Sequence, residues 1–183
     1  MVQRRLRKIK DKVKPTLVLT VICVIASLLL VFAYELTKDR IADQKAQKFY
    51  TSAEALFGKT EYRIVNTKCK YDEVESIAVT SDKKTVIQVC ADGYSKEGIN
   101  ILVGIDEQGA VSGIEFVSLG ETPGLGSKVR DEADFRKQFY GLTAPSESFD
   151  AISGATFSSK GMKHAVDTAL NAYNENKEAI LGG

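Results

Sequence analysis

The chain has 183 residues and a mass of 20.0 kDa, which is room for one domain with an appendage and excludes two independent enzymes. Residues 1–14 carry a net charge of +6 and the remaining residues a net charge of −5, so the body of the protein is acidic. An acidic body argues against a nucleic-acid surface, because phosphate neutralisation supplies most of such affinity, and a hydrophobic content of 44% excludes a disordered chain.

The first predicted element is an apolar run from Thr16 to Ala33 that contains no charged residue. As a helix, its 18 residues would span roughly 27 Å, close to the thickness of the hydrocarbon core of a bilayer. The basic residues before it should stay in the cytoplasm by the positive-inside rule. We therefore predict a cytoplasmic basic segment at 1–15, a transmembrane helix at 16–34 with Pro15 at its first turn, and an extracytoplasmic body.

Two other interpretations of this run are weaker. A cleaved signal peptide would use the small-residue pattern Val31-Phe32-Ala33 before Tyr34, but the run is longer than the usual signal core of about 7 to 15 residues. A buried core helix is disfavoured because a domain of this size rarely hides so uniform a stretch. The sequence favours an uncleaved anchor in the cell membrane.

The rest of the chain predicts an α+β domain. Leu36, Ile41, Phe49, Ala53 and Leu56 recur at helical spacing, which predicts a membrane-proximal helix at 35–58 that stops at Gly58. Turn signals then separate short β-rich stretches, so residues 59–183 are expected to form an antiparallel meander followed by helices that pack on it. The predicted strands are 74–80, 85–91, 100–106 and 110–117, and the predicted helices are 131–140 and 158–176.

The cysteines outside the apolar run are Cys69 and Cys90. On an outward-facing domain they can form a disulfide, and the alternative is two small buried apolar residues. Zinc and iron–sulfur sites need closely spaced cysteines, so no metal site is expected. His164 misses the apolar face of the last helix, which is defined by Met162, Val166 and Tyr173, and should be a surface residue.

Two loops carry the chemistry of the predicted site. The segment 150–159 reads D-A-I-S-G-A-T-F-S-S, with Ser158 and Ser159 as candidate caps of the last helix, so that Thr156 would lie beside free N–H groups that favour a phosphate. The segment 120–127 reads G-E-T-P-G-L-G-S and can present N–H groups and Leu125 to a planar ligand. It lacks the full dinucleotide fingerprint, so a Rossmann site is not expected.

Taken together, E-T-P-G-L-G at 121–126 and D-A-I-S-G-A-T at 150–156 behind one membrane span closely resemble the FMN-binding domain family. The arrangement looks most like the G subunits of the Rnf ion-translocating ferredoxin:NAD oxidoreductase complexes and is similar to the C subunits of the sodium-translocating NADH:quinone reductases. The resemblance implies an electron-carrier subunit, not a complete enzyme alone, that works with other membrane subunits of an electron-transport complex.

The resemblance also implies a covalent cofactor. The hydroxyl of Thr156 would carry FMN as a phosphoester, attached by a separate flavin transferase that uses FAD and magnesium. Recognition by that transferase would involve Asp150, Ser153, Gly154, Ala155 and Thr156. The candidate contacts of the cofactor are Glu121, Thr122, Gly124, Leu125, Gly126, Ser153, Gly154 and Ala155, and the helix-start argument adds Ser158 and Ser159.

Three alternatives remain open from the sequence. Within the redox class these are the quinone-reductase subunit and a stand-alone extracellular electron-transfer flavoprotein. From another class comes a membrane-anchored binding or sensor domain without a cofactor, in which S-G-A-T is an ordinary turn. A hydrolase that uses Ser153 or Thr156 as nucleophile is disfavoured, because G-x-S-x-G does not occur and His164 is the single histidine.

Overall fold

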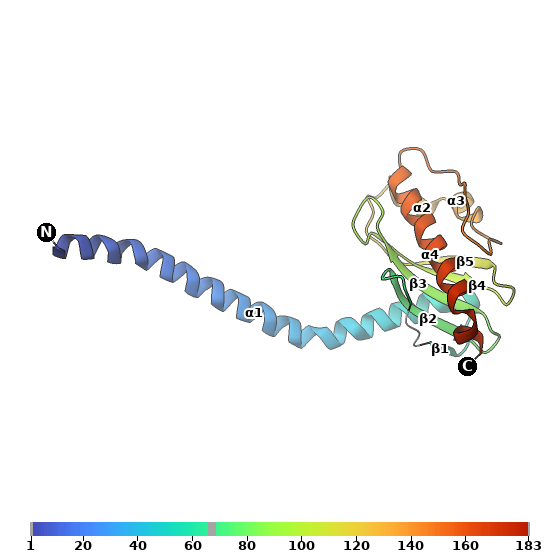
Figure 1. The fold of residues 1–183 in the computed structure, drawn as a ribbon, viewed down its shortest axis with the longest axis horizontal. Coiled ribbons are helices and arrows are strands. Elements are labelled where there is room, and N and C mark those ends of the chain that lie inside the picture. Colours follow the sequence, from blue (N-terminus) through green and yellow to red (C-terminus); the bar gives the residue numbers. More distant parts are fainter. Residues whose placement is uncertain (1, 66–68, 183) are drawn as a thin grey trace. The chain divides into compact units, whose positions relative to one another are not determined.

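A computed structural model describes residues 2–65 and 69–182, with side chains from Lys14 onward. The chain divides into two compact units, Met1–Ala46 and Gln47–Gly183. The helix α1 runs from Val2 to Phe57, so it forms the first unit as far as Ala46 and its last turns belong to the second unit. The second unit holds the sheet and the remaining helices (Figure 1).

Among the described residues, α1 is the one helix that is long and apolar enough to cross a membrane. Its most apolar window has a mean hydropathy of 2.9 and is not buried at all in the structure. Such a helix fits a single-pass anchor. The prediction that Pro15 lies at the first turn of the helix is wrong. Helical backbone continues back to Val2, so Pro15 lies inside α1.

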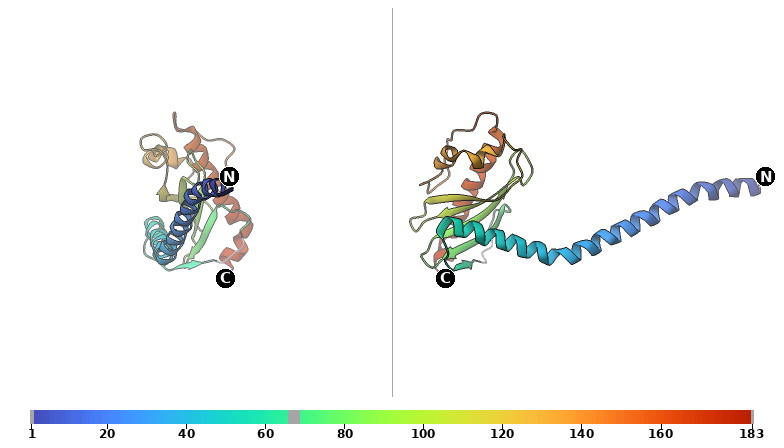
Figure 2. Two further views of the ribbon diagram at one scale, coloured as in Figure 1. Left: turned by 90° about the vertical axis from the view of Figure 1, so that its left-hand side faces the viewer. Right: turned by 180° about the vertical axis from the view of Figure 1, so that it is seen from behind.

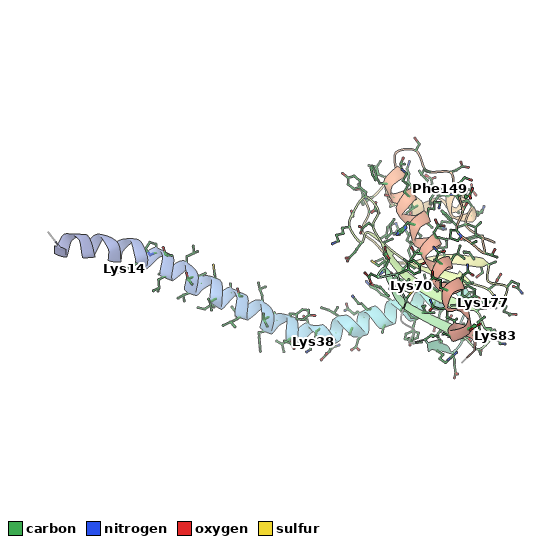
Figure 3. All side chains as sticks on the ribbon, viewed as in Figure 1. Lys14, Lys38, Lys70, Lys83, Phe149 and Lys177 are labelled. Carbon is green, nitrogen blue, oxygen red and sulfur yellow. The ribbon has the colours of Figure 1, made fainter. Side chains whose placement is uncertain are left out.

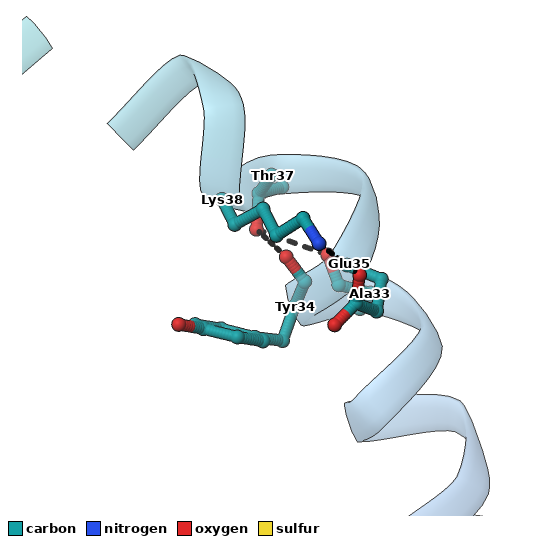
Figure 4. A network of polar contacts seen from close by, with 5 residues as sticks. All are labelled: Ala33, Tyr34, Glu35, Thr37 and Lys38. Atoms are coloured by element: carbon teal, nitrogen blue, oxygen red, sulfur yellow. Dashed lines mark hydrogen bonds and ion pairs between the residues drawn. The ribbon is translucent and has the colours of Figure 1, made fainter. Parts of the chain in front are cut away.

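Hydroxyl groups in this stretch bond to the backbone of their own helix. Thr20 donates to the Thr16 carbonyl at 2.9 Å, and Ser27 donates to the Cys23 carbonyl at 2.8 Å. Just after the apolar run Thr37 donates to the Ala33 carbonyl, and Lys38 pairs with Glu35 at 2.5 Å (Figure 4). The apolar run therefore contains polar side chains whose hydrogen bonds do not require water.

The second unit is built on a five-stranded antiparallel sheet with the strand order β1-β2-β3-β4-β5. This meander confirms the predicted α+β architecture. The predicted strands at 74–80 and 85–91 match β2 and β3, whereas β1 was not predicted because it has three residues. The strands are β1 (Tyr62–Ile64), β2 (Val74–Thr80), β3 (Thr85–Ala91), β4 (Ile99–Ile105) and β5 (Val111–Leu119).

Both faces of the sheet are packed. The larger core lies between one face and α4 (Thr156–Leu181), which crosses the sheet in Figure 1. The last turns of α1 lie on the opposite face (Figure 2). Their Phe49 and Ala53 pack with Ala78, Val86 and Leu102. Because both faces are buried, the central strands read as nearly continuous apolar runs.

The helix α4 buries the face that its sequence predicted, and it extends beyond the predicted range of 158–176 at both ends. Gly161 lets this helix approach the sheet, because a Cβ atom there would collide with the backbone carbonyl of Asp92. The predicted helix at 131–140 is instead two short helices, α2 (Lys128–Asp131) and α3 (Ala133–Lys137). They are separated by Glu132, whose backbone is extended with φ −90° and ψ 101°. The fully buried side chains on the predicted face of α4 are Met162, Val166, Ala169, Leu170 and Tyr173.

Candidate functional site

The two predicted loops meet in one pocket. It has a volume of about 320 Å³ and lies where the 120–127 loop, the 150–155 loop, the first turn of α4 and the turn after β3 come together. The sheet and α4 therefore bring together two segments that are well separated in the sequence. The lining residues are Tyr94, Glu121, Thr122, Leu125, Gly126, Gly154, Ala155, Thr156, Phe157 and Ser158.

The start of α4 provides donors for an anion at this pocket. Thr156 is the first helical residue and its side chain is exposed. The first N–H groups of a helix have no acceptor within it, and the helix dipole adds partial positive charge at this end. Gly154, with φ +78°, makes a left-handed turn just before the helix that other residues adopt only with strain. The arrangement can hold a phosphate close to the Thr156 hydroxyl.

The two serines of this turn do not cap the helix as the sequence argument proposed. The N-cap position is Ala155, which makes no side-chain cap bond, because the helix begins two residues before Ser158. Both serine side chains are buried and engaged inside the protein. Ser158 donates to Glu121, and Ser159 accepts the N–H of Ile152 at 3.1 Å. Their side chains hold the loop in place, so the donors that the helix start offers to a ligand are the backbone N–H groups and the Thr156 hydroxyl.

The 150–155 loop is also held from α3. The Gln138 side chain accepts the N–H of Asp150 at 2.9 Å and donates to the Asp150 carbonyl at 3.2 Å. Phe149, just before the loop, packs against the main core (Figure 3). The side chains of Asp150 and Ser153 remain exposed. The loop thus has a fixed backbone and presents its polar side chains to solvent.

The 120–127 loop forms the opposite wall. Gly124 has φ +74°, and its N–H donates to the Ser127 hydroxyl at 2.9 Å. This turn leaves the Leu125 side chain 51% exposed at the pocket. Thr122 is exposed on the same loop, and Gly126 is buried behind it. An exposed leucine on a fixed turn suits contact with the face of a flat, partly apolar ligand.

Glu121 faces the interior of the protein. Its side chain is 6% exposed, and its carboxylate accepts the N–H of Ser95 at 3.0 Å and the N–H of Tyr94 at 3.3 Å. The Ser158 hydroxyl donates to the same carboxylate. Glu121 therefore lines the pocket, but its carboxylate oxygens accept hydrogen bonds from protein groups.

Two aromatic residues of the pocket were missed by the sequence argument. Tyr94 is 74% exposed and Phe157 69% exposed, and their ring centroids lie 6.5 Å apart with the planes at 70°. Phe157 directly follows Thr156 in the D-A-I-S-G-A-T-F segment, so the sequence could have indicated it as a pocket residue. Tyr94 gives no such signal, because only the folded sheet brings its turn to α4. Exposed aromatic rings beside a pocket provide stacking surfaces for a planar ligand.

The remaining predicted residues lie away from this pocket. Cys69 and Cys90, both within the described residues, are not joined by a disulfide. Cys90 Sγ instead lies 3.7 Å from the Glu97 carbonyl oxygen. His164 is exposed on α4, as predicted, with Nε2 at 3.4 Å from a Glu73 carboxylate oxygen. Groups of three or more side chains able to hold a metal ion do not occur in the described part of the chain.

Part of the chain matches a known family. Residues 93–171, which include the whole lining of the pocket, match the family described as the FMN-binding domain. Over these residues the chain is similar to the FMN-binding domain family. The pocket fits such a cofactor, because Tyr94, Leu125 and Phe157 offer apolar surface to a ring while the start of α4 offers N–H groups to a phosphate.

The chain is also similar to curated proteins that are named as the G subunit of an ion-translocating oxidoreductase complex. The protein from Aliivibrio fischeri is 28% identical over 92% of this chain and 93% of its own length. Those from Shewanella piezotolerans and Pseudomonas aeruginosa are 34% and 30% identical, over 51% and 52% of this chain and 50% and 51% of their own lengths. The similarity to the first relative thus includes the N-terminal helix as well as the domain.

Proposed function

We propose that this protein is the FMN-carrying electron-transfer subunit of an Rnf-type ion-translocating oxidoreductase complex. The observation that carries the proposal is the meeting of the two motif loops in one pocket beside the exposed Thr156 at the start of α4. The names of the full-length relatives support the complex, and the family of residues 93–171 supports the cofactor. When bound, the flavin supplies the redox chemistry, and the protein supplies binding, orientation and electrostatics.

The attachment we propose is a phosphoester at Thr156. The Thr156 Oγ forms a bond to the phosphorus of the FMN half of FAD, the pyrophosphate bond of FAD breaks, and AMP leaves with the threonine proton going to solvent. No electron is transferred in this step. A separate flavin transferase with magnesium would catalyse it, recognising Asp150, Ser153, Gly154 and Ala155 around the acceptor. Exposure of Thr156 and of the side chains of Asp150 and Ser153 is consistent with access for that enzyme.

Each wall of the pocket has a distinct part in this proposal. The backbone N–H groups of the first turn of α4 hold the phosphate, while Leu125, Tyr94 and Phe157 contact the ring. Thr122, Gly124 and Gly126 fix the wall that carries Leu125. Attachment through the phosphate leaves the ring chemically unchanged. It also keeps the site filled where free FMN is scarce, since occupancy no longer depends on ligand concentration.

The proposed location follows from the charge pattern of the sequence. The basic segment at 1–15 stays in the cytoplasm, the membrane helix follows, and the FMN-binding domain is extracytoplasmic. The domain would receive electrons from one membrane subunit of the complex and pass them to another. An isolated span with no ionisable residue other than Cys23 within 16–33 does not provide an ion path, so ion translocation would belong to those partners.

The test is the intact mass of the full chain after co-expression with a flavin transferase, combined with flavin fluorescence in a denaturing gel. The proposal expects a gain of one FMN less one water, located on the peptide that contains Thr156. Thr156→Ala should abolish the gain. Thr143→Ala is the control, because Thr143 is an exposed threonine that does not line the pocket, and it should keep the label. An unmodified wild-type chain, or a labelled Thr156→Ala chain, would contradict the attachment.

A further inference from the structure

Glu121 is a buried acidic side chain in the wall of the pocket. Its Oε1 accepts the N–H of Ser95, and its Oε2 accepts the N–H of Tyr94 and the hydroxyl of Ser158. These donors come from the turn after β3 and from the first turn of α4, and Glu121 itself comes from the loop after β5. One carboxylate thus joins three of the four segments that form the pocket, including the two that carry the aromatic residues Tyr94 and Phe157.

Three glycines make room for this carboxylate. A Cβ atom at Gly93 or at Gly98 would lie 2.5 Å from Glu121 Oε1, and a Cβ atom at Gly126 would lie 2.5 Å from Oε2. Distances this short are not tolerated between a carbon and a carboxylate oxygen, so a side chain at any of these positions would displace Glu121. The glycines let the backbone of the turn after β3 and of the 120–127 loop approach the carboxylate closely. The enclosed carboxylate depends on its three donors, because a buried charge without hydrogen bonds is strongly unfavourable.

The hydrogen bonds also decide what Glu121 can do for a ligand. Ser158 has one hydroxyl proton, which it donates to Glu121, so that proton is not available to a phosphate. Tyr94 keeps its ring 74% exposed while its backbone N–H is bonded to Glu121. The carboxylate therefore fixes the backbone of a residue whose side chain faces the pocket.

We propose that Glu121 is a positioning residue, which fixes Tyr94 against the flavin ring and ties it to the first turn of α4 through Ser158. The inference rests on the proposed function for the identity of the ligand and assigns Glu121 a role other than ring contact. Glutamine cannot replace it, because an amide offers one acceptor oxygen where backbone donors occupy both carboxylate oxygens. In Glu121→Gln either Tyr94 or Ser95 must lose its acceptor.

The first test needs no flavin. Amide hydrogen exchange at single-residue resolution on the full chain in detergent should show faster exchange at Tyr94 or Ser95 in Glu121→Gln, by about tenfold or more for a lost bond to a charged group. The amide of Glu97, in the same turn, is held by Asp92 at 2.7 Å and should not change. Asp92→Ala should show the reverse pattern. Unchanged exchange at both Tyr94 and Ser95 would overturn the proposal.

The second test uses the flavin-loaded chain and asks whether Glu121 acts through Tyr94. Glu121→Gln should reduce the visible circular dichroism of the bound flavin by about twofold or more, and it should have a much smaller effect in a Tyr94→Leu background, since coupled residues are not additive. An equal effect in both backgrounds would mean that the carboxylate acts on the flavin directly and would overturn the role. A wild-type chain without flavin would contradict the proposed function, while the exchange measurement would still decide on the positioning of the turn.

Discussion

The two ends of α4 border two different cavities, and the smaller one contains the predicted site residues. At the N-terminal end lies the pocket of about 320 Å³ with Thr156. At the C-terminal end lies a cavity of about 670 Å³ that includes Ile180 and Leu181 together with Arg63 and Lys83. The larger cavity contains none of the predicted site residues. Size alone would therefore not have selected the pocket that contains the predicted site residues.

The difference between the two ends comes from the polarity of the helix backbone. The N-terminal end presents N–H groups and favours anions, whereas the C-terminal end presents carbonyl groups and favours cations. Arg63 makes use of the second end, since its guanidinium donates to the Ile180 carbonyl at 3.4 Å. A phosphate is therefore expected at the start of the helix and a basic side chain at its end.

Among the substitutions that test the difference between the two ends of α4, Gly161→Leu should have the largest effect on stability and on FMN attachment. The new side chain would collide with the Asp92 carbonyl and with Gly93, so the N-terminal half of α4 must move away from the sheet. We expect a loss of unfolding free energy of about 1–3 kcal/mol or more, as for other overpacked sites, together with loss of FMN attachment. Denaturant unfolding and intact mass measure these effects. Gly182→Leu, at the opposite helix end, is the positional control, and its attachment should persist.

A smaller effect is expected from Gly154→Ala, which changes backbone conformation with little change in volume. The left-handed backbone at φ +78° costs a non-glycine residue about 1–2 kcal/mol. Because the nearest atom to a Cβ there is Leu125 Cδ2 at 3.9 Å, the cost is conformational and not a collision. The initial rate of FMN attachment by a flavin transferase should fall severalfold. An unchanged rate would show that the transferase does not require the left-handed conformation of Gly154.

Arg63→Ala tests whether the C-terminal end of α4 influences FMN attachment at its N-terminal end. The Arg63 guanidinium bonds to the C-terminal end of α4, so its removal should lower the unfolding free energy by about 1 kcal/mol or more. Attachment of FMN should proceed at the wild-type rate, measured by in-gel fluorescence over time. A slowed attachment would mean that the C-terminal cavity influences the Thr156 site and that the two ends are not independent.

The smallest effect is expected in acid, at Glu175 in the C-terminal half of α4. Hydrogen bonds from Lys70, and then from Tyr71, lower the pKa of Glu175 below its ordinary value (Figure 3 labels Lys70). A carboxyl group whose pKa is lowered by folding stabilises the protein above its unfolded pKa, and this contribution is lost as the pH falls through the folded pKa. Glu175→Gln should flatten the acid limb of the thermal stability profile slightly. An identical acid limb in both proteins would show that this contact contributes nothing.

Much of the fold could be predicted because local signals determined it. β2 and β3 were bounded by turn residues, and the apolar face of α4 followed from helical periodicity. The start of α4 was placed two residues late, because Ser158 and Ser159 are typical cap residues by type while the structure uses them in tertiary contacts. The single helix predicted at 131–140 is two helices, α2 and α3, because the backbone of Glu132 is extended. Glutamate is a common helix residue, so the sequence does not indicate this break.

The site was predicted in part for the same reason. The segments 121–126 and 150–156 carry a recognisable pattern, and the structure places both at one pocket. The pattern could not show that the Glu121 carboxylate faces inward, because its partners Tyr94 and Ser95 are 27 and 26 residues away. Nor could it identify Tyr94 as part of the pocket. Contacts between separate turns depend on strand register, which the sequence specifies only through the whole sheet.

The join between α1 and the sheet determines where the domain can be cut. Gly58, with φ +78°, ends the helix, and the Tyr62 hydroxyl on β1 bonds to the Ala53 and Gly58 carbonyls at 2.7 and 3.0 Å. A soluble truncated chain that begins at residue 59 would leave Ala78, Val86 and Leu102 without Phe49 and Ala53 above them. Such a fragment should aggregate through this uncovered face, whereas one that begins before Gln47 retains its cover. The last turns of the helix that leads from the anchor are thus part of the folding unit.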